Sequence, residues 1–181
     1  MRRTLTGSLV FVIAASYLLQ ITVSGYEERL LLNRLYIENG EYYRFITVAL
    51  LHGGLWHLAF NLYALHALGT LVEGYFGQKK YALILIVSLL SGSTLSVLFN
   101  PAYVYSIGAS GMIFGLFGAL AITGKRMGAD YRSIMTLVGI NLFLPFVISN
   151  IDWRAHVGGF VGGLVATLLI KPTRRGNIYY N

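Results

Sequence analysis

Residues 106–118 read SIGASGMIFGLFG, and in this stretch a serine stands between two glycines where an apolar helix is expected to begin. Gly111 and Gly115 form a G-x-x-x-G pattern, and small residues at this spacing let membrane helices pack closely. Ser110 is then either a small packing residue at such a contact or a nucleophile placed inside a lipid bilayer. The residues around this stretch decide between the two interpretations.

The composition is that of a membrane protein. Of the 181 residues, 56% are hydrophobic and 12% are charged, whereas a soluble domain carries about a quarter charged residues. Twenty-one glycines against three prolines fit closely packed transmembrane helices. The chain has no cysteine, so the sequence excludes a disulfide framework, a thiolate nucleophile and a cysteine-ligated metal.

Six apolar runs are expected to form transmembrane helices, because most of them approach the ~20 residues that cross about 30 Å of hydrocarbon. The runs are Leu9–Val23, Leu55–Phe76, Tyr81–Phe99, Ser110–Thr123, Ile134–Ile148 and Ala155–Ile170. The first run lacks a cleavage site of small residues, so we expect a retained helix and not a signal peptide. No linker or low-complexity segment divides the chain. We therefore predict an all-α membrane fold that forms a single domain over residues 1–181.

The net charge of +7 follows the expected topology. Six spans put both termini on one side of the membrane, and that side collects ten of the fourteen basic residues: Arg2, Arg3, Lys79, Lys80, Lys125, Arg126, Arg132, Lys171, Arg174 and Arg175. This asymmetry follows the positive-inside rule, so both termini are expected to be cytoplasmic. The charge therefore indicates a lipid bilayer as the partner of this chain, and we expect no nucleic acid to bind it.

Residues 25–52 form a long segment on the outer side of the membrane. The segment mixes leucines, tyrosines and Phe45 with arginines and glutamates, and aromatic residues beside charges are typical of a membrane interface. We expect an amphipathic external loop, between the first and second helices, that lies partly in the outer leaflet and contains short helices of its own.

Counting from the cytoplasmic charges places a serine and a histidine at the same depth. Ser110 lies fifteen residues before Lys125, and His156 lies fifteen residues before Lys171. At ~1.5 Å per residue both side chains lie ~22 Å above the inner face, on two different helices. No carboxylate is expected at this depth beside His156. Because a neutral imidazole is the usual base that activates a serine hydroxyl, the sequence predicts a Ser–His dyad and not a triad.

Donors for an oxyanion are expected close to Ser110. His57 and Asn61 are four residues apart and share a helix face, within about two turns of the level of the serine. The backbone N–H of Ser110 stands at the exposed start of a helix, where the dipole favours negative charge. Gly108 and Gly111 allow a tight turn and a close approach of the neighbouring helix. For His57 and Asn61 taken alone, a polar bond between helices remains the alternative.

Other polar residues receive structural interpretations. His52 can belong simply to the interfacial loop, and Glu73, near the inner end of its helix, is interpreted as an anchor that bonds loop backbone. Four histidines could suggest zinc, but no H-E-x-x-H motif occurs and His52 lies five residues from His57, off one helix face. We expect no metal and no organic cofactor.

Several segments, in the right order and spacing from about Tyr42 to Gly163, resemble motifs of the rhomboid intramembrane serine proteases. They are the G-x-S-G motif at Gly108–Gly111, the H-x4-H-x3-N motif at His52, His57 and Asn61, the helix 6 histidine motif at Ala155–Gly159, the Trp-Arg segment at Glu41–Phe45 and the helix 2 glutamate at Glu73. The Trp-Arg segment has Tyr43 in place of tryptophan. Phe114 stands where members often carry a tyrosine packed on the catalytic histidine.

The resemblance implies a rhomboid-like bundle of six transmembrane helices around a water-filled cavity that opens to the outside. Its implied site residues are Ser110 as nucleophile, His156 as general base, His57, Asn61 and the Ser110 backbone in the oxyanion hole, His52, Gly108, Gly111 and Phe114 as support, and Arg44 and Glu73 as structural residues. The substrate would be a transmembrane segment, cleaved near its outer end and typically after a small residue. It would enter laterally past the fifth helix and the loop Asn150–Arg154. The family comparison also fits a multi-pass protein of a prokaryotic plasma membrane.

Two alternatives remain beside a serine endopeptidase. One is an inactive rhomboid-like protein that binds membrane clients without cleaving them, although such relatives usually lack the serine or the histidine. The other is a small transporter, a class that often shows internal repeats, and the sequence contains no such repeat.

Overall fold

The computed structural model describes residues 4–128, 130, 132–133, 136, 139–140 and 151–170. Its long helices are α1 (Leu5–Thr22), α5 (Leu55–Phe76), α6 (Gln78–Phe99), α7 (Ser110–Thr123) and α9 (Trp153–Leu169). The bounds of α5 and α7 coincide with the predicted runs. The other three helices begin two to four residues earlier than expected, because polar residues such as Thr6 and Gln78 continue the helical turns.

Among the described residues, three helices are long and apolar enough to cross a membrane: α1, α5 and α6, with 18, 22 and 22 residues. Helix α7 has 14 residues and α9 has 17, which are fewer than the ~20 that a straight crossing needs. The expected helix Ile134–Ile148 lies mostly outside the described residues, as do the terminal charges. The structure therefore shows an apolar helical protein but does not confirm the count of six spanning helices.

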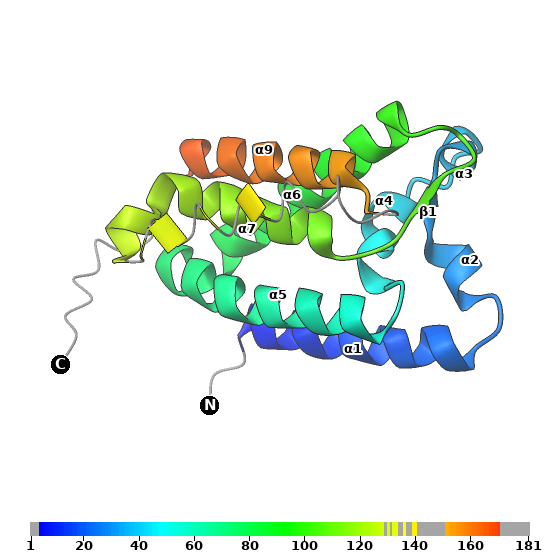
Figure 1. The fold of residues 1–181 in the computed structure, drawn as a ribbon, viewed down its shortest axis with the longest axis horizontal. Coiled ribbons are helices and arrows are strands. Elements are labelled where there is room, and N and C mark those ends of the chain that lie inside the picture. Colours follow the sequence, from blue (N-terminus) through cyan, green and yellow to red (C-terminus); the bar gives the residue numbers. More distant parts are fainter. Residues whose placement is uncertain are drawn as a thin grey trace.

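The helices form two groups that lie side by side (Figure 1). Helix α1 packs along α5, while α6, α7 and α9 pack on one another, and α5 also contacts α7. Eleven of the fourteen residues of α7 are buried, so this short helix is the core of the protein. Helices α5, α7 and α9 all begin at the end where residues 26–50 gather (Figure 1). The first residues of three helices are thereby brought together.

Glycines set the distance between α7 and α9. A Cβ atom built on Gly159 would overlap the backbone of Gly111, and one built on Gly163 would overlap the backbone of Gly115. The G-x-x-x-G pattern of α7 thus faces the glycines of α9, and the two backbones touch. Residues 106–118 therefore do form a close helix contact, which is one of the two interpretations given above. This contact does not exclude a chemical role for Ser110.

The segment of residues 25–52 contains the expected short helices, namely α2 (Tyr26–Leu30), α3 (Arg34–Glu38), α4 (Arg44–Thr47) and the 3-10 helix η1 (Val48–Leu50). It also contains the strand β1 (Leu32–Asn33), which pairs antiparallel with β2 (Tyr105–Ser106). The described fold is thus mostly helical, and this ladder of two residues per strand is an addition that the sequence did not predict. Backbone groups of the two loops would otherwise be buried without partners, and the short ladder satisfies them.

Arg44 organises the segment of residues 25–52. Its side chain is 3% exposed, and its guanidinium donates to the carbonyls of Glu28 and Leu31 at 2.8 and 2.7 Å. It also pairs with the Glu41 carboxylate at 2.7 Å and lies 4.0 Å from the ring centre of Tyr36. One buried cation thus joins α2, α3 and α4.

Glu73 joins the last turn of α5 to the start of α1. Its carboxylate accepts hydrogen bonds from the backbone N–H of Leu5 at 2.7 Å and of Thr6 at 2.9 Å, and from the Thr6 hydroxyl at 2.6 Å. We expected this residue to bond loop backbone. It instead satisfies N–H groups in the first turn of a helix, which have no partner within the helix itself.

We expect Glu73→Gln to destabilise the protein by about 1–3 kcal/mol, because the amide can accept at only one of its two positions and so leaves a buried donor unpaired. The matched control is Glu38→Gln, since the Glu38 side chain is exposed. Thermal unfolding of the detergent-solubilised variants measures both. Equal unfolding temperatures for the two variants would contradict the anchor.

Candidate active site

Ser110 is the first residue of α7, and the loop before it requires a glycine. Gly108 has a φ of +131°, which side chains rarely adopt, and its N–H donates to the carbonyl of Val48 at 2.9 Å. Ser110 itself is half-buried. As the first residue of a helix, it has a backbone N–H without a partner inside that helix.

His156 lies in the first turns of α9 and is 8% exposed. Its Nε2 is 2.9 Å from the hydroxyl oxygen of Ser110. The two residues were predicted to lie at the same depth on different helices, and the structure brings them into hydrogen-bonding contact. The glycine contact between α7 and α9 allows this, because a wider separation of the two backbones would place the imidazole out of reach.

The second ring nitrogen of His156 makes no hydrogen bond within the described part of the chain. Asp152 lies one turn before His156, so a carboxylate is closer than the sequence led us to expect. Both carboxylate oxygens of Asp152 are nevertheless occupied by other donors. When Ser110 donates to Nε2, the neutral ring carries its proton on Nδ1, and the described residues present a serine–histidine pair and not a triad.

Phe114 holds the imidazole from one side. Its ring stacks on His156 with 4.0 Å between centroids and 12° between planes, and Phe117 meets Phe114 edge-on at 5.6 Å. Phe114 lies one turn after Ser110 on α7, so a single helix carries both the hydroxyl and the ring that covers the imidazole. The stack restrains the ring of His156 in the orientation that faces Ser110.

His57 borders the same site from α5. Its Nδ1 accepts a hydrogen bond from the backbone N–H of Gly53 at 3.2 Å, so the neutral ring carries its proton on Nε2. A Cβ atom on Gly108 would lie 3.2 Å from this Nε2 and 3.7 Å from the hydroxyl of Ser110. Gly108 therefore leaves open the space in which His57 and Ser110 face each other.

Asn61 is buried one turn after His57. Its amide donates to the carbonyl of His57 at 2.8 Å, and its side-chain oxygen has no partner among the described residues. No hydrogen bond joins Asn61 to Ser110 in the part of the chain that the structure describes. The second amide proton of Asn61 remains available as a donor.

His52 lies under His57 and not at the surface. It is 1% exposed, and its ring meets that of His57 edge-on with 5.1 Å between centroids. Burial, and to a smaller extent His57, lower the pKa of His52 to about 3, so its ring is neutral at physiological pH. Gln20 of α1 holds the backbone of His52 through two hydrogen bonds of 3.0 Å. Sequence reasoning missed this role of Gln20.

Asp152 is a second residue that sequence reasoning missed. Its Oδ1 accepts from the backbone N–H of Arg154 at 3.2 Å and of Ala155 at 3.3 Å, so it caps α9. An aspartate just before an apolar helix is an N-terminal signal that the sequence does contain.

Within the described ranges, no group of three or more histidine, aspartate or glutamate side chains is arranged to hold a metal ion.

The structure brings a serine of α7 and a histidine of α9 into contact beside helices α1, α5 and α6, which are long and apolar enough to cross a membrane. These features define a multi-pass membrane protein with a polar pair among its helices. Comparison with known protein families agrees, since residues 39–173 match the family described as Rhomboid domain. The chain belongs to the rhomboid family and is an integral membrane protein.

Relatives of the chain occur in bacteria and plants. It is 39% identical to "Rhomboid protease GluP" of Bacillus subtilis (strain 168) over 145 residues, which are 77% of this chain and 28% of GluP. It is 32% identical to "Putative rhomboid protease YdcA" of the same strain over 161 residues, which are 85% of this chain and 77% of YdcA. "Inactive RHOMBOID-like protein 8" of Arabidopsis thaliana is 36% identical over 76% of this chain and 41% of its own length. The chain thus spans less than a third of GluP and about two fifths of the plant relative.

Proposed function

We propose that this protein is an intramembrane serine endopeptidase that cleaves transmembrane segments of other membrane proteins near their external ends. The observation that carries the proposal is the 2.9 Å contact between the Ser110 hydroxyl and His156 Nε2. Two relatives whose names describe them as rhomboid proteases support the same reaction class.

In the proposed reaction His156 Nε2 takes the proton of Ser110 while the serine oxygen bonds to the scissile carbonyl carbon. The tetrahedral intermediate collapses when its C–N bond breaks, and the imidazolium gives the proton to the leaving amine. The remaining ester on Ser110 is then hydrolysed by water, for which His156 again serves as the base. Phe114 keeps the imidazole in place through these transfers, because its stacked ring limits rotation.

The oxyanion that forms on the substrate carbonyl needs donors that are already in position. We assign this role to the backbone N–H of Ser110, the Nε2–H of His57 and the free amide proton of Asn61. The Gly53 N–H supports the assignment, because its bond to Nδ1 of His57 leaves the ring proton on the nitrogen that faces Gly108. His52 supports the ring of His57 from below.

The substrate class follows from where the site lies. The pair stands at the starts of α7 and α9, which adjoin residues 26–50 (Figure 1). In the topology that we expect, these residues face the outside, so the scissile bond would lie near the external end of a membrane-embedded segment. We expect lateral entry past residues 134–148, which lie mostly outside the described part of the chain, and cytoplasmic termini in a prokaryotic plasma membrane. The similarity to an inactive relative favours one alternative, which is a protein that binds membrane clients without cleaving them.

A fluorophosphonate probe tests the proposal, because it forms a covalent bond only with an activated serine. We expect the purified protein to be labelled at Ser110, as mapped by peptide mass spectrometry, and Ser110→Ala to lose the label. Cleavage of a model transmembrane substrate in proteoliposomes then separates a protease from a client-binding protein. Absence of both labelling and cleavage in folded protein would favour the client-binding alternative.

A further inference from the structure

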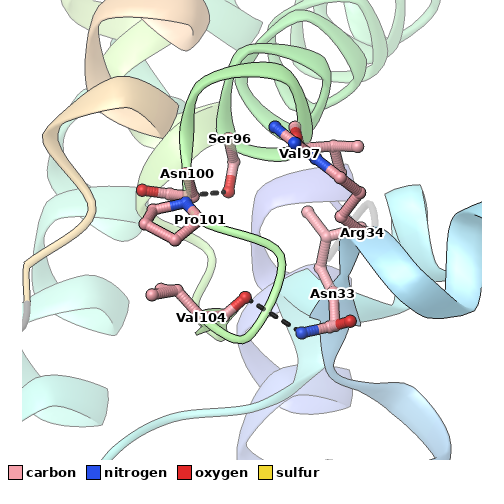
Figure 2. Close-up of a pocket in the computed structure, with 8 residues that line it drawn as sticks. Asn33, Arg34, Ser96, Val97, Asn100, Pro101 and Val104 are labelled. Carbon is pink, nitrogen blue, oxygen red and sulfur yellow. Dashed lines mark hydrogen bonds between the residues drawn. The ribbon is translucent and has the colours of Figure 1, made fainter.

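Four polar side chains meet one turn outside the Ser110–His156 pair. Asp152 Oδ2 accepts hydrogen bonds from the Ser96 hydroxyl at 2.5 Å, the Ser106 hydroxyl at 2.6 Å and the Asn100 amide at 3.0 Å. Ser96 and Asn100 stand together at the end of α6, and the Asn100 amide also donates to the hydroxyl of Ser96 (Figure 2). We call Ser96, Asn100, Ser106 and Asp152 the Asp152 cluster.

The cluster joins the three segments that must be aligned for the reaction. Ser96 lies in the last turn of α6 and Asn100 caps the C-terminus of that helix. Ser106 belongs to β2 in the loop that leads to Ser110, and Asp152 caps the helix that carries His156. Ser96, Asn100 and Ser106 are all at most 9% exposed. Donors this deeply buried need an acceptor, and one carboxylate serves all three.

The cluster and the candidate dyad have the same spacing along the chain. Ser106 precedes Ser110 by four residues, and Asp152 precedes His156 by four residues. Both hydrogen-bonded pairs, Ser106–Asp152 and Ser110–His156, are therefore separated by 46 positions in sequence. The outer pair is shorter, at 2.6 Å against 2.9 Å, and it carries a full charge. The Ser106–Asp152 bond therefore fixes how the loop before α7 is aligned with the start of α9.

We propose that Asp152 is a positioning residue that aligns His156 with Ser110 by holding the α6 end, the Ser106 loop and the start of α9 at one carboxylate. The expected effect of Asp152 on kcat rests on the proposed function, whereas its expected effect on the position of the His156 ring does not. Asp152 does not touch the reacting atoms, because its oxygens are directed to Ser96, Ser106, Asn100 and the N–H groups of α9.

Asp152→Ser separates positioning from helix capping. Serine is as good an N-cap as aspartate, so α9 keeps its cap, but the shorter side chain cannot reach the hydroxyls of Ser96 and Ser106. We expect kcat on a transmembrane substrate, and the rate of fluorophosphonate labelling, to fall about tenfold to a hundredfold because a small misplacement of reacting groups has this effect. KM should stay within about twofold, since the substrate contacts are unchanged.

Ser106→Ala removes one donor of the cluster and should lower the labelling rate in the same direction. When Asp152→Ser and Ser106→Ala are combined, the two losses of labelling rate should not add, because both substitutions break the same hydrogen bond. The control is Ser93→Ala, since Ser93 is another buried serine of α6 and donates to the carbonyl of Phe45, outside the cluster. It should lose a similar amount of thermal stability and keep the wild-type labelling rate per folded molecule.

A measurement without catalysis keeps the two proposals apart. The chain has four histidines, so 15N-histidine NMR can follow the His156 ring, assigned through His156→Ala. Ser110→Ala should shift the signal of His156 Nε2 by removing the hydroxyl that contacts it. Asp152→Ser should shift the same signal in the same direction, because the misaligned ring would lose that contact. Wild-type signal and labelling in Asp152→Ser, or an equal loss of labelling in Ser93→Ala, would overturn the positioning role. If wild-type protein fails to label, the protease proposal falls while the NMR signal still tests the inference.

Discussion

His156→Ala is expected to lower kcat for cleavage of a transmembrane substrate roughly a thousandfold, within the range that a positioned general base contributes. His156 Nε2 lies 2.9 Å from the Ser110 hydroxyl oxygen. Without this imidazole, no other described side chain is placed to take the proton of Ser110. The hydroxyl would remain a weak nucleophile, although the proposed oxyanion donors would still be present. Labelling by a fluorophosphonate should fall by a comparable factor, because it needs the same activated oxygen.

Two variants control this experiment. His156→Gln keeps a side chain of intermediate size beside Phe114, so it tests the loss of the base even if His156→Ala folds poorly. His66→Ala removes a histidine of α5 whose side chain is exposed, and it should keep activity within about twofold of the wild type. Full activity in folded His156→Gln would show that another group activates Ser110.

Gly159→Val should have the largest effect on stability. A Cβ atom at this position overlaps the backbone of Gly111, and backbone cannot rotate away as a flexible side chain does. Overpacking of a tight core costs about 1–3 kcal/mol or more, so we expect either a protein that does not fold or one in which α7 and α9 separate. In the second case the contact between Ser110 and His156 is lost, and labelling falls below detection.

Gly74→Ala is the matched control, because Gly74 also lies inside a helix but a Cβ atom there meets nothing within 4 Å. It should be neutral or stabilise the protein by about 0.5–1 kcal/mol, through the lower entropy of the unfolded chain. Expression level, thermal unfolding in detergent and fluorophosphonate labelling measure both variants. A Gly159→Val variant as stable and as reactive as Gly74→Ala would show that the two helices need not touch.

The long helices were predictable because apolar runs in this chain end at glycines and charges. Gly54 and Gly77 delimit α5, and Ser110 begins α7 where it was expected to begin. The contact between Ser110 and His156 was predictable for a related reason. The rise per residue is constant in a helix, so Ser110 and His156, each fifteen residues before a lysine that follows its helix, were expected at the same depth.

Other features were not predictable because they depend on contacts between distant segments. The bond between Gln20 and His52 joins positions 32 residues apart, and that between Ser106 and Asp152 joins positions 46 apart. A polar residue in a loop carries no local sign of its partner. The same holds for the pairing of β1 with β2, since each strand has only two residues.

The amino-acid sequence alone determined that this is an apolar helical chain for a membrane and where the long helices of the described residues lie, because length, hydropathy and charge act locally. Only the tertiary structure decided which faces of those helices meet. Helix α7 is apolar on every side, so no periodicity distinguishes the face that carries Phe114 toward His156. That choice is made by glycines where backbones touch and by buried hydrogen bonds between segments, and both exist only once the chain has folded.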